Sequence, residues 1–423
     1  MNKLTIRFCF CVCLSAFVLS MPAVAADYLI KNGRLVTSSE AGVIDRGDIL
    51  VRDGRIEQIG SVLDVPGATV IDAAGAWVTP GLFDSSTYLG LGEVESSTVR
   101  SDHRLRDSDM GAGFQVALAI DRHSQLIPIT RIEGVTRAIV KPSAGSEVFA
   151  GQSAIIHLAG TRDFIVNDSN AVFVELGEGG RRYAGGSRAK ALIDLVDALR
   201  EAKEYSNHRR DIERARFRDL RESTLDLEAL VPVLARDKPL VIDVDRASEI
   251  EMVLDRLGEF DIGIVLVGGR EAWKVRDLLA DRGVSVVIDP LDNIPRNFDL
   301  LATRLDNAAM LAAAGVTVAF MTSDLFGDNR TLTQGAGVAV ANGMDWQDAV
   351  NAITSNAARI WGLADSYGKL ERGMDADIVI WNGDPLELMS APTTMLIKGQ
   401  PVKLESRQTQ LRDRYKDLRV FSR

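Results

Sequence analysis

The chain has 423 residues, of which 46% are apolar and 26% are charged. That length and composition suit a large globular protein with one large domain and one smaller domain. The formal net charge of −10 argues against a non-specific nucleic-acid binder, although it leaves room for a local basic site.

The first 25 residues have the three parts of a secretory signal peptide. Lys3 and Arg7 supply the positive charge, residues 9–21 form a short apolar core, and Ala23-Val24-Ala25 is an A-x-A cleavage site. We expect cleavage before Ala26. A membrane anchor is the alternative, but the apolar run is short and ends in small residues. Losing Lys3 and Arg7 would take the net charge from −10 to −12.

All the cysteines lie in this segment: Cys9, Cys11 and Cys13. The mature chain would therefore have no disulfide, no thiolate metal site and no cysteine nucleophile. No apolar run after Ala26 is long enough to span a membrane. We expect an exported protein without membrane association after cleavage, periplasmic if the source is Gram-negative.

The mature chain begins with short predicted strands over residues 27–77, separated by Asn32-Gly33 and Asp53-Gly54, which are hairpin turn signals. The centre of the chain then alternates β-rich runs with helical segments, a pattern typical of a parallel sheet. The predicted strands lie at residues 138–140, 172–174, 240–242, 264–267, 284–288 and 317–321, and the predicted helices at 188–205, 247–258, 271–282 and 307–314.

Two polar stretches interrupt this alternation. Residues 96–110 are charged and form either a lid over the site or a plain surface excursion. Residues 209–221 carry many charges, and we expect a solvated helix there. At the other end of the chain, residues 403–423 are predicted to form a helical tail.

Residues 78–90 resemble the first-strand signature of the amidohydrolase superfamily, P-G-x-x-D-x-H-x-H-x-G. The matching positions are Pro80, Gly81, Asp84 and Gly90. Ser86 and Tyr88 stand where the two histidines would be. Because side chains at i and i+2 of a strand share a face, both would point to the barrel mouth, where such a histidine pair grips a divalent metal.

Residues 368–381 resemble a second signature of that family, G-x-L-x-x-G-x-x-A-D-x-V-x-W/F. The resemblance is to imidazolonepropionase-like members. It implies an α/β fold, with a (β/α)8 TIM-type barrel at residues 79–363. A small β-sandwich would be built from both chain ends, residues 26–78 and 364–402.

The same resemblance implies several site residues. Residues 239–247 are similar to a strand-5 segment carrying H-A-x-R-A, so Asp243 replaces the histidine and Asp245 becomes a substrate-binding candidate. The strand-6 candidate, residues 265–269, has no histidine. Asp324 stands at the position of the family's strand-8 aspartate. There it would hold a metal and take a proton from water. The alternative is that Asp324 is a turn residue after the strand. The chain's histidines, none in a motif position, are His103, His123, His157 and His208.

Three further residues have two interpretations each. Glu178 lies in a segment similar to the family's G-E-N and is either a substrate-binding pocket residue or a loop charge. Glu93 is either a pocket residue, able to form an acid/base pair with Asp324, or a loop charge. Lys141 could be read as the family's carboxylated lysine, although the following Pro142 and glycine-rich loop fit another segment better.

Asp243 and Asp324 are the metal candidates, Ser86 is a substrate-binding candidate and Tyr88 a catalytic one, and all four offer oxygen donors only. Such a set suits magnesium, manganese or calcium better than zinc. A divalent metal (zinc, manganese or magnesium) and a metal-free pocket both stay open.

Two functions follow. The first is hydrolysis of a non-peptide C–N bond in an amide or cyclic amide, with water held by Asp324 and the carbonyl polarised by a metal or by Tyr88. The second is a catalytically inactive protein that binds a small ligand or a protein partner, which the missing histidines favour. Bound metal or converging carboxylates would favour hydrolysis. The substrate and the oligomeric state stay open.

Overall fold

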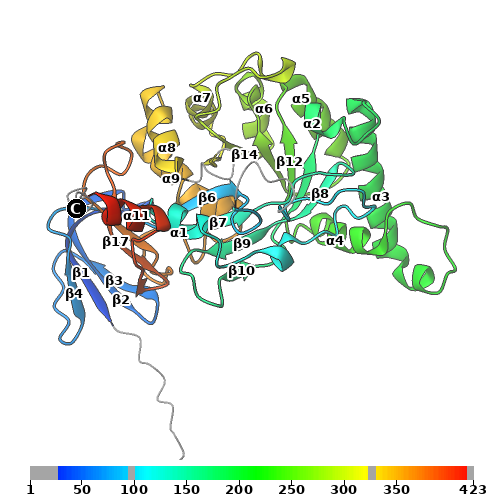
Figure 1. Cartoon of the computed structure of the whole chain (residues 1–423). Helices are drawn as coiled ribbons and strands as arrows, with labels where there is room; N and C mark the ends of the chain where they lie inside the picture. The colour runs from blue at the N-terminus through cyan, green and yellow to red at the C-terminus, as the bar shows by residue number, and fades with distance from the viewer. Residues whose placement is uncertain (1–26, 94–100, 323–329, 417–423) are drawn as a thin grey trace, which may run out of the picture.

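The computed structural model describes residues 27–93, 101–322 and 330–416, and it has a mixed α/β fold (Figure 1). At one end of the molecule, strands from both ends of the chain form a sheet, and the rest consists of largely parallel strands with helices around them. The predicted signal peptide, residues 1–25, and Asp324 lie outside the described residues. Within the described ranges, no helix is long and apolar enough to cross a membrane.

The eight-stranded sheet contains residues that are far apart in the sequence. Its order is β18-β17-β16-β5-β1-β2-β3, and β4 pairs with β1. The strands are β1 Tyr28–Val36, β2 Val43–Arg52, β3 Arg55–Gly60, β4 Thr69–Asp72, β5 Trp77–Pro80, β16 Ile378–Trp381, β17 Pro392–Ile397 and β18 Gln400–Pro401. Strand β5 joins the two halves, because it pairs with β1 on one side and with β16 on the other.

Asn32-Gly33 lies inside β1, so its prediction as a hairpin turn is wrong. The ladder between β1 and β2 continues on both sides of this dipeptide, with a register shift between Ile30 and Gly33. Asn32 takes a positive φ of 57°, and its backbone N–H donates to the Asp48 carboxylate at 2.8 Å. The dipeptide does adopt a positive φ, as a turn residue would, but here the positive φ belongs to a β-bulge within the strand. The turn predicted at Asp53-Gly54 is correct, with φ of 50° and 77° between β2 and β3.

Each strand predicted in the centre of the chain is present, because those short apolar runs are buried on both faces. The strands are β6 Leu82–Thr87, β7 Val135–Val140, β8 Phe149–Gln152, β9 Ala154–His157, β10 Ile165–Asn167, β11 Val172–Glu175, β12 Leu240–Val244, β13 Ile264–Gly268, β14 Ser285–Ile288 and β15 Val318–Phe320. Strands β11 to β15 pair in parallel in chain order, and β6 is parallel to β7. Asp84 links the sheet that contains β6 and β7 to the sheet that contains β11 to β15. Its carboxylate accepts from the hydroxyl of Thr322, just after β15, at 2.6 Å.

Helices cover these strands (Figure 1). They are α1 Leu126–Arg131, α2 Gly177–Gly180, α3 Arg188–Glu213, α4 Thr224–Leu234, α5 Ala247–Leu257, α6 Arg276–Asp281, α7 Asn307–Ala313, α8 Leu332–Ala341, α9 Trp346–Ala352, α10 Ser355–Ile360 and α11 Arg407–Tyr415, with 3₁₀ turns η2 Val116–Ala119, η3 Ala272–Val275 and η4 Phe298–Leu300. The helix predicted at residues 209–221 is only partly correct. Helix α3 is interrupted at His208 and ends at Glu213, and residues 214–222 are irregular.

A buried ion pair joins the eight-stranded sheet to the parallel strands. Arg137 on β7 is 2% exposed and contacts Asp375 at 2.5 Å and Asp377 at 3.1 Å. The Tyr367 hydroxyl donates to the carbonyls of Gly81 and Leu82, at 2.7 and 3.0 Å, beside this pair. The aspartates of the C-terminal signature therefore hold the two sheets together.

Candidate functional site

One cavity lies where four strands end at their carboxyl ends. It has a volume of about 90 Å³, and we call it the strand-end pocket. Its polar lining comes from Tyr88 after β6, Lys141 after β7, Glu175 at the end of β11 and Asp243 on β12. Its other walls are Pro142, Ser143, Ala144, Ala150, Phe173 and Val174. Carboxyl ends of parallel strands are where α/β folds bind ligands.

Glu175 and Asp243 are neighbours, because β11 and β12 pair in parallel with these residues in register. Lys141 is only 4% exposed, and its Nζ lies 5.3 Å from the centre of the Tyr88 ring. The pocket thus combines two carboxylates, an amine and a phenol within one cavity.

Glycines of α2 make room for Glu175. A Cβ at Gly179 would lie 1.9 Å from the Glu175 Oε1, and one at Gly180 would lie 2.0 Å from its carbonyl oxygen. This explains why glycine follows Glu178 where the similar family segment has asparagine. Sequence reasoning missed Glu175, and the glycine pair was the signal that could have found it.

Asp84 and Ser86 lie on β6, before Tyr88, and line neither this pocket nor the cavity next to it. Both are fully buried on β6. The Asp84 carboxylate accepts from the backbone N–H groups of Ser86 and Thr322, at 3.2 and 3.3 Å, in addition to the Thr322 hydroxyl. Burial raises the pKa of Asp84 to about 7. Within the part of the chain that the structure describes, the Ser86 hydroxyl has no hydrogen-bond partner.

The segment at residues 101–110 packs beside the pocket. The backbone N–H of Ser143 donates to the His103 carbonyl at 2.8 Å, and the backbone N–H of Ser108 donates to the Ser146 hydroxyl at 3.2 Å. The His103 ring lies 4.7 Å from the Tyr88 ring, centre to centre. The segment thus brings an imidazole to a site whose strands carry none, and no motif marked it.

A second cavity, of about 370 Å³, shares Glu175 and Asp243 with the first, and we call it the ion-pair cavity. Its other charged residues are Glu178, Arg182, Asp245, Arg270, Asp292 and Arg296. Arg270 contacts Asp245 at 2.8 Å and Asp292 at 2.5 Å. Burial raises the pKa of Asp245, and Arg270 offsets part of that shift.

The remaining candidates have structural partners. Glu178 accepts from Arg188 at 2.8 Å and also contacts Arg181 at 3.3 Å. Glu93 is exposed, and its carboxylate accepts from the backbone N–H of Gln125 at 3.0 Å, at the start of α1. Glu93 lines neither cavity. Its suggested pairing with Asp324 involves a residue outside the described ranges.

The described residues do not fit a metal centre of the family's kind. Among them, no three His, Cys, Asp or Glu side chains come together in a way that would hold a metal ion. The donors near the strand-end pocket are carboxylates and hydroxyls, and they are interspersed with Lys141 and Arg270. Of the other histidines, His157 Nε2 lies 2.9 Å from the Asp163 carbonyl, and His208 stacks on Phe217.

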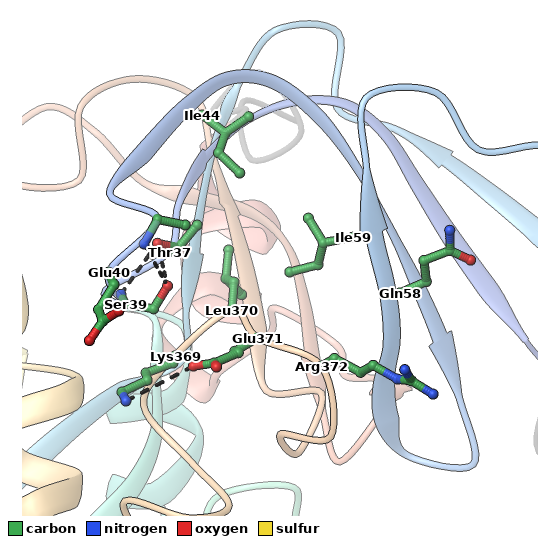
Figure 2. Close-up of a pocket in the computed structure, with 11 residues that line it drawn as sticks. Thr37, Ser39, Glu40, Ile44, Gln58, Ile59, Lys369, Leu370, Glu371 and Arg372 are labelled. Carbon is green, nitrogen blue, oxygen red and sulfur yellow. Dashed lines mark hydrogen bonds and ion pairs between the residues drawn. The ribbon is translucent and has the colours of Figure 1, made fainter.

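A further cavity, of about 530 Å³, lies elsewhere, between strands β2 and β3, the loop after β1 and the run at residues 369–372 (Figure 2). Its residues are Thr37, Ser39, Glu40, Ala41, Ile44, Gln58, Ile59, Lys369, Leu370, Glu371 and Arg372. It is an open groove on the eight-stranded sheet, where Lys369 and Glu371 contact one another at 4.0 Å. Its lining residues lie away from the ends of the parallel strands β11 to β15, so we place the candidate site at the strand-end pocket.

The chain has parallel strands with polar side chains at their carboxyl ends, and these strands are joined to a sheet made from both chain ends. Known proteins with similar sequences and folds show which class this arrangement belongs to. The model of the Amidohydrolase family matches residues 253–406. The chain is similar to the amidohydrolase superfamily, and imidazolonepropionases are among the proteins that it resembles.

The similarity to individual proteins extends over most of the chain. An amidohydrolase from Thermotoga maritima MSB8 superposes with a TM-score of 0.82 and 25% identity, covering 89% of this chain and 99% of that one. An imidazolonepropionase from Acidiphilium cryptum is 25% identical over 418 residues, which cover 86% of this chain and 95% of the relative. Amidohydrolase tasK from Hapsidospora irregularis is 19% identical over 387 residues, and the chain spans only 39% of that longer protein.

Proposed function

We propose that the protein is an exported hydrolase of a non-peptide C–N bond in a small amide or cyclic amide. The parallel strands would form a (β/α)8-type barrel, and the strand-end pocket would be its mouth. The observation that carries this proposal is the convergence of Tyr88, Lys141, Glu175 and Asp243 from four strand ends on one cavity. The amidohydrolase relatives support the reaction class.

The pocket residues supply the parts that amide hydrolysis needs. Glu175 or Asp243, or the predicted strand-8 aspartate Asp324, would accept a proton from a water molecule as its oxygen bonds to the carbonyl carbon. The Lys141 ammonium and the Tyr88 phenol would donate hydrogen bonds to the oxyanion that forms. The proton then passes to the leaving nitrogen as the C–N bond breaks.

One observation favours a second function, binding without turnover. Members of this family are generally metal-dependent, whereas the described residues lack a metal-ligating cluster. A strand-end pocket with a polar lining but without catalytic activity would bind a small molecule and release it unchanged.

A panel of amides separates the two functions. The mature protein would be incubated with hydantoins, lactams, imidazolones and N-acyl amino acids, and products would be followed by mass spectrometry. We expect turnover of a member of the panel and a loss of roughly 10²–10⁴-fold in Asp243→Asn. Asp45→Asn, at a side chain 93% exposed, is the control and should keep full activity. Saturable binding with no product from any amide would favour the second function.

Export is tested separately. Residues 1–25 should be absent from protein recovered from the periplasm of a Gram-negative host, as read by N-terminal sequencing. An intact N-terminus on recovered protein would contradict cleavage before Ala26.

A further inference from the structure

The carboxylates at the ends of β12 to β14 are already neutralised by a side chain. Arg270 follows β13, is 20% exposed, and bridges Asp245 at 2.8 Å and Asp292 at 2.5 Å. Although burial alone would lower the pKa of Arg270, Asp245 and Asp292 raise it overall, so the guanidinium stays charged. Arg296 adds a second contact to Asp292 at 2.5 Å.

The geometry at Gly268 shows where this cation sits. Gly268 is the last residue of β13, the strand-6 candidate in which no histidine was found. A Cβ there would lie 2.7 Å from Asp245 Oδ1, 3.1 Å from Arg270 Nη1 and 3.3 Å from Asp243 Oδ1. A side chain at this position would collide with the ion pair. The space beside this strand end is therefore filled by a guanidinium and two carboxylates.

A second cation shares a cavity with Asp243. Lys141 is buried and lines the strand-end pocket together with Glu175 and Asp243. Asp243 thus lies near the same Gly268 position as Arg270, and it shares a cavity of about 90 Å³ with the Lys141 ammonium. Both cations are fixed by the fold, and like charges at such range repel strongly in a buried site.

We infer that Lys141 and Arg270 take the place of the divalent ions of the family, and that the folded chain retains no divalent ion at this site. Arg270 pairs with Asp245 and Asp292, and Lys141 shares a cavity with Glu175 and Asp243. The inference does not depend on the proposed reaction, because it concerns which cation balances these carboxylates. It would hold equally for a protein that only binds its ligand.

Metal content of the unaltered protein is the first test. The mature protein would be purified without chelator and without added metal, and its metal measured by mass spectrometry. We expect a content far below one ion per chain, and no change in Tm on adding zinc, manganese or magnesium. A near-stoichiometric ion whose removal by chelator lowers the Tm would overturn the inference.

Removing a cation should create a need for metal. In Arg270→Met, Asp245 and Asp292 lose their shared partner, so the Tm should fall and should recover when manganese or magnesium is added. Arg270→Lys keeps the charge and should stay insensitive to metal. Arg304→Met, which breaks an exposed pair with Asp306, is the matched control and should also stay insensitive.

If Arg270→Met does not fold, the metal dependence of the Tm is tested in Lys141→Met instead. It leaves Glu175 and Asp243 without their ammonium, and we expect manganese or magnesium to raise its Tm more than that of the unaltered protein. A charge-removing variant that folds and shows no metal-dependent gain would overturn the replacement of metal by side-chain cations. Activity on amides is not a readout here, so failure of this inference and failure of the proposed hydrolysis are distinguishable.

Discussion

Asp84 shows how one residue of the first-strand signature serves the fold. It is fully buried on β6 and accepts from the Thr322 hydroxyl and from two backbone N–H groups. Within the described ranges, no cation is paired with it. Burial therefore dominates, and the carboxyl keeps its proton until about pH 7.

This burial makes stability depend on pH. Between about pH 4 and pH 7, the folded chain keeps the Asp84 proton and the unfolded chain has lost it, so stability falls as pH rises through this window. The shift of roughly three pKa units corresponds to about 4 kcal/mol at most. Asp84→Asn cannot ionise, so its Tm relative to the unaltered protein should rise from pH 5 to pH 8. Thermal melts across that range test this, and a constant Tm difference would contradict it.

Motif spacing placed Tyr88 and Asp243 at strand ends, and both line the strand-end pocket, whereas residues brought in by long-range contacts carry no local signal. Tyr88 and Asp243 were candidates because the first-strand signature and the strand-5 resemblance placed them at strand ends. Glu175 becomes a site residue only once β11 pairs with β12 in register, which no local pattern encodes. Arg270 matters because Asp292, on a different loop, reaches it. Asp324 stays a prediction.

At the scale of elements, two loops hold each other beside the pocket. The loop after β7 packs so closely on residues 101–110 that a Cβ at Gly145 would lie 1.7 Å from the Leu105 carbonyl oxygen. Only glycine permits this approach. Because Gly145 does not need a positive φ, the constraint comes from this contact alone.

Gly145→Ala should therefore release residues 101–110 from the loop. We expect faster amide exchange at Ser108 and Ser143, whose N–H groups bond across this contact, and a loss of about 1–3 kcal/mol in stability. Hydrogen exchange read by mass spectrometry measures the first effect. Gly263→Ala is the matched control, since its nearest heavy atom is 4.0 Å away. Equal exchange in both variants would contradict the contact.

Elements were predicted best where apolar runs are short and buried, and worst where charge dominates. The central strands followed from their β-rich apolar sequences. Residues 209–221 were predicted to be helical because charged residues favour helices, yet α3 ends at Glu213. Leu220 and Phe217 are only partly buried beyond that point, so little apolar burial supports further helical turns.

At the scale of the whole molecule, the Arg137 ion pair ties the eight-stranded sheet to the parallel strands. Both Arg137 and Asp377 are buried, and Asp377 also accepts from the backbone N–H of Lys398 at 2.7 Å. Breaking a buried pair leaves an uncompensated charge, which costs about 3–5 kcal/mol.

Arg137→Met should therefore lower the free energy of unfolding by about 3–5 kcal/mol in urea titrations. Arg236→Met is the control, since it removes an exposed pair with Asp261 and should cost about 0–1 kcal/mol. Similar midpoints for the two variants would mean that the buried pair does not stabilise the junction.

The pairing of both chain ends in one sheet has a consequence for biosynthesis. Strand β5 finds its partner β16 only after Ile380, which pairs with Val78, has been synthesised. Until then β5 presents an open edge, which is a template for association with other chains. Contacts so distant in sequence also form slowly. Chains interrupted before residue 378 should consequently aggregate during synthesis or export, and a chaperone that covers this edge would raise the yield of the full-length protein.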